Sequence, residues 1–211
     1  MHPSIAITVV SLTLAAASVF GQKVESAGAP PSELNASVAA LLAKDGFKVT
    51  AADGKVICDL WLRAAMPSGY ASKEDSVSLP MIPAASLLGA VRFPARYADR
   101  RGQTIQAGVY TMRYGNYPQN GDHQGAAPQR DFLVLVPAAD DSNGAANLEF
   151  DPLMKLSRKA SGTPHPAVFS FWKGEGDGKP DFHKEGENDW ALATKIGDVP
   201  VVVILVGKSE G

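Results

Sequence analysis

GVYTMRYGNYPQNGDHQGAAPQRDFLVLVPA, residues 108–138, holds two strand-like runs separated by a polar loop. Tyr110, Met112 and Tyr114 recur at every second position of the first run, which places them on one face of a strand. The second run, FLVLV at 132–136, is apolar at every position, as is typical of a central strand buried on both faces. The pair predicts two core strands joined by a long loop.

Outside this region, short apolar or alternating runs bounded by Gly, Pro, Asn and Asp recur along the chain. Together with the central pair they predict about eight short strands, and no repeat of solenoid or propeller length interrupts them. The pattern favours a mainly β protein, a single jelly-roll-like β-sandwich with two short helices, over alternating βαβ units. The expected strands are 47–49, 56–63, 87–93, 109–114, 130–137, 167–172, 190–195 and 199–206.

The two helices are predicted from their end signals. Ser32 is a suitable N-cap, Leu34 and Val38 begin an apolar stripe at helical spacing, and Asp45-Gly46 closes the segment. In the second helix Asp151-Pro152 supplies an acidic N-cap followed by Pro at the first helical position. That helix is expected to run to about Ala160, with Gly162 ending it.

The N-terminus indicates export. Residues 5–20 form an uncharged, mainly apolar run of about 16 residues, which is shorter than the roughly 20 needed to span a bilayer as an uncleaved anchor. We therefore expect a signal peptide over 1–21, a flexible spacer over 22–31, and a β-sandwich domain with an N-terminal helix over 32–211. The mature protein is expected to be periplasmic or extracellular, with no membrane span.

Composition limits the partners and the redox chemistry. The chain of 211 residues has a net charge of −2, so no strong field draws it to nucleic acid. Cys58 is the only cysteine, which excludes an internal disulfide, and its position in an alternating run predicts a buried structural thiol. The sequence does not indicate the oligomeric state.

The central loop carries the densest group of hydrogen-bonding and ionisable side chains. Aromatic faces beside a few polar groups are what a small-ligand site requires, and a small molecule or a carbohydrate is the expected ligand. The alternative is structural: Arg130 and Asp131 pair with neighbours and hold the loop closed. The candidate ligand-binding residues are Tyr114, Asn116, Tyr117, Asp122, His123, Gln129 and Arg130.

A metal site is the alternative function. His123, His165 and His183 all fall in expected loops, and imidazoles from one end of a sandwich would suit zinc or copper. His123 and His165 are the first candidate ligands, with His183 as a substitute for the latter, in a metal-binding protein or metal-dependent enzyme. Their spacing matches no metal motif, so no cofactor is expected otherwise.

Catalytic motifs are absent from the sequence. It has no nucleophile elbow, no HExxH, no phosphate-binding loop and no dinucleotide fingerprint. The function predicted from the residues is therefore a non-catalytic ligand-binding or interaction module, and an enzyme is not favoured.

Three further features have two interpretations each. Trp61, flanked by charges on the outer face of its strand, is either a ligand platform or, as we favour, covered by a second layer. The basic cluster in 92–101 is either an anion site or, as favoured, a solvated loop. The Gly-rich, acidic segment 173–189 is expected to be an exposed loop or a long hairpin connection rather than a calcium site.

Several segments resemble a known group of proteins. LGAVRFP at 88–94 and RRGQTIQAGVYTM at 100–112 contain an I-x-A-G-x-Y-x-M turn between strands. With DGKVICDLWLR at 53–63 and LMKLSRKASGTPHP at 153–166, the chain resembles uncharacterised exported bacterial β-sandwich proteins of the acidobacterial type. The resemblance implies the fold and the compartment, and no activity.

Overall fold

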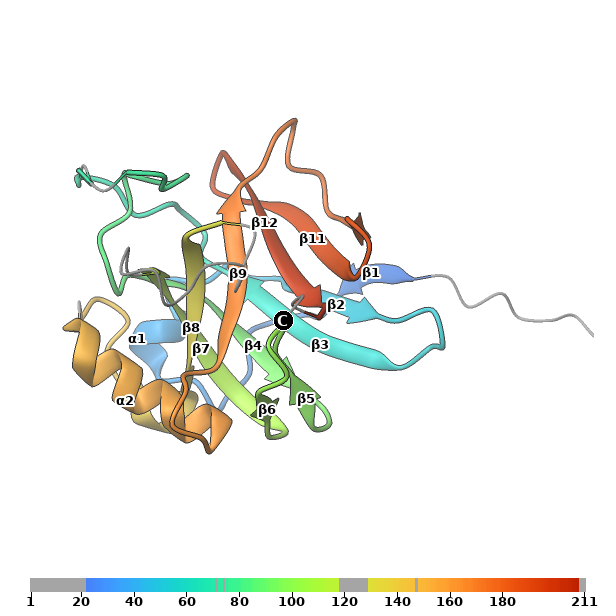
Figure 1. Ribbon diagram of the computed structural model, residues 1–211, viewed down its shortest axis with the longest axis horizontal. Coiled ribbons are helices and arrows are strands. Elements are labelled where there is room, and N and C mark those ends of the chain that lie inside the picture. Colours follow the sequence, from blue (N-terminus) through green and yellow to red (C-terminus); the bar gives the residue numbers. More distant parts are fainter. Residues whose placement is uncertain (1–21, 71, 74, 118–128, 147, 209–211) are drawn as a thin grey trace, which may run out of the picture.

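The computed structural model describes residues 22–70, 72–73, 75–117, 129–146 and 148–208 (Figure 1). This part of the chain is mainly β with two α-helices, as predicted. The helices are α1 (Ala36–Ala39) and α2 (Phe150–Ser161), with a 3-10 turn, η1 (Ala138–Asp140). The strands are β1 (Lys23–Ser26), β2 (Phe47–Thr50), β3 (Val56–Leu62), β4 (Leu87–Phe93), β5 (Tyr97–Ala98), β6 (Thr104–Ile105), β7 (Gly108–Asn116), β8 (Asp131–Pro137), β9 (Val168–Lys173), β10 (Asp181–Glu185), β11 (Asp189–Ile196) and β12 (Val199–Val206).

Ten strands form one antiparallel sheet in the order β1-β2-β3-β4-β7-β8-β9-β12-β11-β10, and β5 pairs separately with β6. The edge strands β1 and β10 contact each other, so the sheet is nearly closed into a barrel. The sequence had indicated two opposed sheets. The difference lies in strand order, because alternation shows which side chains are buried but not which strands are neighbours. The last four strands, β9-β12-β11-β10, have a Greek-key order.

The inside of the barrel is filled by the alternating side chains of its strands. Tyr110, Met112 and Tyr114 from β7 share one face, as predicted, and this face points inward and packs with Leu133 and Leu135 from β8. The strand β8 is buried over almost its whole length, as the FLVLV run predicted. The barrel core is therefore packed, so a ligand site must lie outside it.

Cys58 also points into this core and is fully buried with no disulfide partner. Burial, together with the negative charge of neighbouring Asp59, raises the pKa of the Cys58 thiol far above its ordinary value. The thiol therefore stays protonated and behaves as a small apolar side chain, as the sequence predicted.

Trp61 is covered by a second layer, as we favoured from the sequence. It is 1% exposed and packs beneath Leu34, Val38 and Leu42, which come from the α1 region. Its indole Nε1 donates a hydrogen bond of 2.8 Å to the carbonyl oxygen of Gly28. This contact fixes the segment before α1 against β3 and β4.

The first helix is much shorter than predicted. Asn35, rather than Ser32, is the N-cap, and its Oδ1 accepts a hydrogen bond of 2.9 Å from Ser37 N. After one turn the backbone joins β3 instead: Ala43 N donates to the carbonyl of Leu62, and Leu42 bridges to Arg63. Pairing with the sheet therefore ends a helix that periodicity alone would have continued.

Two edge strands were not predicted. Part of the expected spacer, Lys23–Ser26, is β1 and pairs with β2. The Gly-rich acidic segment contains β10, which pairs with β11 and has Phe182 as its one buried residue. β1 has no buried residue and β10 has one, so neither shows an alternation to detect, and both strands depend on a neighbour that is already in place. Among the described residues, no helix is long and apolar enough to cross a membrane.

Candidate functional site

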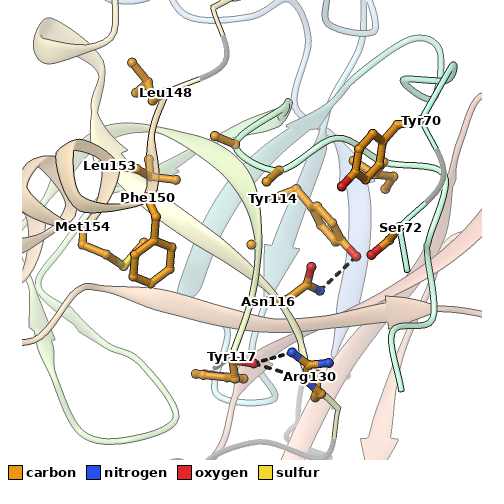
Figure 2. Close-up of a pocket in the computed structure, with 14 residues that line it drawn as sticks. Tyr70, Ser72, Tyr114, Asn116, Tyr117, Arg130, Leu148, Phe150, Leu153 and Met154 are labelled. Carbon is orange, nitrogen blue, oxygen red and sulfur yellow. Dashed lines mark hydrogen bonds between the residues drawn. The ribbon is translucent and has the colours of Figure 1, made fainter. Parts of the chain in front are cut away.

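A cavity of about 570 Å³ lies where β7 ends and β8 begins, between the N-terminal half of α2 and the segment that precedes β4 (Figure 2). The lining residues lie within 70–85, 114–117, 130 and 148–154, so segments that are far apart in the sequence meet at this cavity. The described residues that line it are Tyr70, Ser72, Ile82, Ala84, Ala85, Tyr114, Gly115, Asn116, Tyr117, Arg130, Leu148, Phe150, Leu153 and Met154.

One wall of the cavity is apolar and comes mainly from α2. The helix begins at Phe150 after Glu149 and ends where Gly162 adopts a left-handed conformation, with φ 67°, as predicted for its C-terminus. Leu153 and Met154 are buried against the outer face of β8, whereas Phe150 remains 49% exposed at the rim. An exposed phenylalanine beside buried aliphatic side chains gives this wall a surface for an apolar ligand.

The opposite wall is polar and is formed by Tyr70, Ser72, Tyr114 and Asn116 (Figure 2). Asn116 Nδ2 donates a hydrogen bond of 3.1 Å to Tyr114 Oη. Within the described residues nothing donates to the Asn116 carboxamide oxygen, which leaves it as an acceptor at the cavity. Tyr70 is 51% exposed, so its hydroxyl is available at the same rim.

Below the cavity, Tyr114 and Asp131 form a buried pair. Tyr114 Oη donates a hydrogen bond of 2.5 Å to Asp131 Oδ1, and Ser78 N donates one of 2.9 Å to Asp131 Oδ2. Burial, and then the hydrogen bond to Asp131, raise the pKa of Tyr114 well above its ordinary value. The phenol therefore stays neutral and donates from β7 to Asp131. Because Ser78 N donates to the same carboxylate, Asp131 ties the segment before β4 to the start of β8.

Arg130 closes the same corner. Its Nε and Nη2 donate to the carbonyl oxygen of Tyr117 at 3.1 and 2.8 Å, and Nη1 donates to the carbonyl of Asp75. The sequence left open that Arg130 and Asp131 pair with their neighbours, and the hydrogen bonds of both residues agree with that alternative. Arg130 therefore holds the ends of β7 and β8 together while its side chain lines the cavity.

Four of the seven predicted ligand residues line this cavity: Tyr114, Asn116, Tyr117 and Arg130. Gln129 is exposed and is not part of the lining. Asp122 and His123 lie outside the described residues. The two tyrosine rings are not free to stack on a sugar, because Tyr114 is 2% exposed and the ring of Tyr117 stacks on Phe132 at 4.5 Å.

The two described candidate metal ligands lie on different elements. His165 is exposed in the turn between α2 and β9, and His183 lies on β10. His183 Nδ1 is 3.2 Å from Asp181 Oδ2, and its Nε2 is 3.3 Å from Glu185 Oε2. In the described ranges no three His, Cys, Asp or Glu side chains are arranged to hold a metal ion. The third predicted ligand, His123, is outside those ranges.

The basic cluster around β4 and β5 is largely paired with acids rather than simply solvated. Arg92 Nη2 lies 2.5 Å from Asp59 Oδ2, and Arg100 Nε lies 3.0 Å from Asp189 Oδ1. Arg101 Nη2 lies 3.0 Å from Asp99 Oδ2. These arginines therefore join strands and turns of the barrel to one another.

Sequence reasoning missed the α2 wall and the contribution of Tyr70 and Ser72. The available signal was Phe150 and Met154, which are four residues apart and so share one face of the helix. The predicted helix began at Asp151, which left Phe150 outside it. No local pattern marks Tyr70 and Ser72, since they reach the cavity only through tertiary packing.

Comparison of the chain with protein-family models, with curated proteins and with solved structures gives no match.

Proposed function

We propose that this protein is an exported, non-catalytic binding protein that holds an amphipathic small molecule in the cavity between α2 and the ends of β7 and β8. The observation that carries the proposal is the division of the cavity into two walls. Phe150, Leu153 and Met154 supply an apolar surface, and Tyr70 and Asn116 supply hydrogen-bonding groups opposite it. A concave site of several hundred Å³ with this division is typical of small-ligand pockets.

The burial of the tyrosines favours an apolar ligand body over a carbohydrate. The two tyrosines predicted to stack on a sugar, Tyr114 and Tyr117, are both buried, and the exposed ring of Phe150 lies beside aliphatic side chains. Export is supported by the signal-like residues 5–20 of the sequence.

Titration with N-phenyl-1-naphthylamine tests the binding proposal. This neutral amine joins a naphthalene to a phenyl ring and fluoresces when it enters an apolar site. We expect saturable binding with a Kd on the order of 10 µM. Ala84 is exposed and lines the cavity, so A84W places an indole in the site without altering the barrel core. We expect A84W to weaken binding at least about tenfold, a loss of about 1.4 kcal/mol.

The matched control is A52W, in the exposed turn between β2 and β3, on the other side of the molecule from α2 (Figure 1). It adds the same side chain and is expected to bind the probe as the unmodified protein does. Equal binding by A84W and A52W would place the probe elsewhere and remove the basis of the proposal.

A further inference from the structure

A second, smaller cavity of about 210 Å³ continues from the first along α2. The two cavities share Tyr117, Phe150 and Met154, so they adjoin at the exposed ring of Phe150. The second cavity has an apolar floor that includes Phe132 and Val168 from β8 and β9. A ligand in the first cavity that is long enough would extend past Phe150 into the second.

Apart from tyrosine, the ionisable side chains that line the two cavities are all basic. They are Arg130 in the first cavity and Arg101, Arg158 and His165 in the second. No described residue lining either cavity is an Asp or a Glu. The distribution favours a ligand that carries negative charge at the end of the second cavity.

Not all of these side chains are available to a ligand. Arg101 is paired with Asp99, and its Nη2 also donates to the carbonyl of Pro166 at 2.6 Å. Arg158 and His165 are exposed, and neither forms an ion pair with an acid in the described part of the chain. Arg130 donates from Nε, Nη1 and Nη2 to backbone carbonyls, so the guanidinium that remains for a ligand is that of Arg158, with His165 as a second hydrogen-bonding group.

The spacing on α2 sets the order of these groups. Phe150, Met154 and Arg158 follow one another at intervals of four residues, so they form one stripe along the helix. The stripe runs from an exposed aromatic ring, over a flexible thioether, to a guanidinium near the C-terminus of the helix. A ligand whose apolar body lies on Phe150 and Met154 therefore has its end beside Arg158.

We propose that the ligand class is a singly charged anionic amphiphile, an organic acid with an aromatic or aliphatic body. Its body lies over Phe150 and Met154, and its acid group is bound by Arg158 and His165. This inference rests on the proposed function, because it assigns the charge of the molecule bound in the same site. A guanidinium suits the acid group because its planar array of donors matches a carboxylate.

The test compares two probes that differ by one charge. N-phenyl-1-naphthylamine is neutral, and 8-anilinonaphthalene-1-sulfonate has the same skeleton with a sulfonate, which stands in for the acid group. At low salt we expect the sulfonate probe to bind about five- to tenfold more tightly than the neutral one. About 0.5 M sodium chloride should abolish most of that preference, because the screening length falls to a few ångström.

R158Q removes the charge and keeps most of the side-chain length. We expect it to weaken the sulfonate probe about fivefold and to leave the neutral probe unchanged. R96Q, at an exposed arginine in the turn before β5, makes the same change of net charge away from the cavities and should affect neither probe.

The outcomes separate the two proposals. If the neutral probe binds and the sulfonate probe binds no more tightly, the anionic ligand class is wrong and the binding function stands. The same conclusion follows if R158Q and R96Q weaken the sulfonate probe equally. If neither probe binds at the cavity, the binding function itself fails.

Discussion

Replacing Asp141 with alanine is expected to lower the free energy of unfolding by about 3–5 kcal/mol, the usual cost of stranding one member of a buried ion pair. Arg113 on β7 is 0% exposed, and Asp141 follows η1 and is 4% exposed. The guanidinium would keep its charge in D141A and lose the carboxylate that balances it. Urea unfolding followed by tryptophan fluorescence measures the change.

The size of this effect follows from how completely the pair is connected. Arg113 Nε and Nη2 donate to the two oxygens of Asp141, each at 2.7 Å. The remaining donors reach backbone carbonyls of Ala85, Asn143 and Ala146 at 2.6 to 2.8 Å. Arg113 thus joins the segment before β4 to the chain that leads into α2, and both supply walls of the cavity.

Two controls isolate the buried pair. D140A removes the neighbouring carboxylate, whose partner Lys159 is half exposed, and should cost about 1 kcal/mol or less. In an R113M background Asp141 keeps only the hydrogen bond from Thr111 Oγ1, so adding D141A should cost clearly less than D141A alone. Equal losses from D141A and D140A, or additive losses from R113M and D141A, would contradict the role given to the pair.

The second large effect is expected at Asp131. D131A should lower the free energy of unfolding by about 2–3 kcal/mol, because it leaves Tyr114 Oη and Ser78 N without their acceptor. Both donors belong to segments that border the cavity, so D131A should also weaken binding of the neutral probe. Urea unfolding and probe titration on the same preparation measure the two effects.

Y114F is the matched control for D131A. It removes the hydrogen bonds that Tyr114 Oη makes with Asp131 and Asn116 and keeps the aromatic ring in the barrel core, so it should cost about 1–2 kcal/mol. It also leaves the contact between Ser78 and Asp131 intact. A loss in D131A no larger than that in Y114F would show that Asp131 does not hold the segment before β4 in place.

The strands around the central loop were predictable because their signals are local. The alternation of Tyr110, Met112 and Tyr114 follows from the pleat of a strand, and the continuous apolar run of β8 follows from its burial on both faces. The end of α2 at Gly162 was predictable for the same reason, since a left-handed C-terminal residue favours glycine.

What the sequence did not reveal depends on partners distant in the chain. The helix from Ser32 was expected to continue, but residues 41–43 pair with the end of β3. The strand β10 is recognisable only from its register with β11. The ion pair of Arg113 joins residues 28 apart, one of them in a loop, and no periodicity marks it.

The candidate site, too, was predictable from the sequence only in part. Its polar part was predictable from the density of hydrogen-bonding groups near the ends of β7 and β8, where Tyr114, Asn116, Tyr117 and Arg130 lie. Its apolar wall was not, because Leu153 and Met154 read as ordinary core positions of a helix. Only the packing of α2 on β8 shows that Phe150 remains exposed beside them.

Methionine methyl NMR tests the central claim most directly, namely that a small molecule binds between α2 and the ends of β7 and β8. Of the methionines in the described chain, Met154 lines the cavity, Met112 is buried inside the barrel, and Met66 and Met81 are half-buried against it. The protein is labelled with ¹³C-methyl methionine, the Met154 signal is assigned from M154L, and N-phenyl-1-naphthylamine is added.

Ring currents from the bound naphthalene should shift the Met154 methyl signal in proportion to saturation, while the Met112 signal stays in place. A probe that binds by fluorescence yet leaves Met154 unmoved would contradict the assignment of the site.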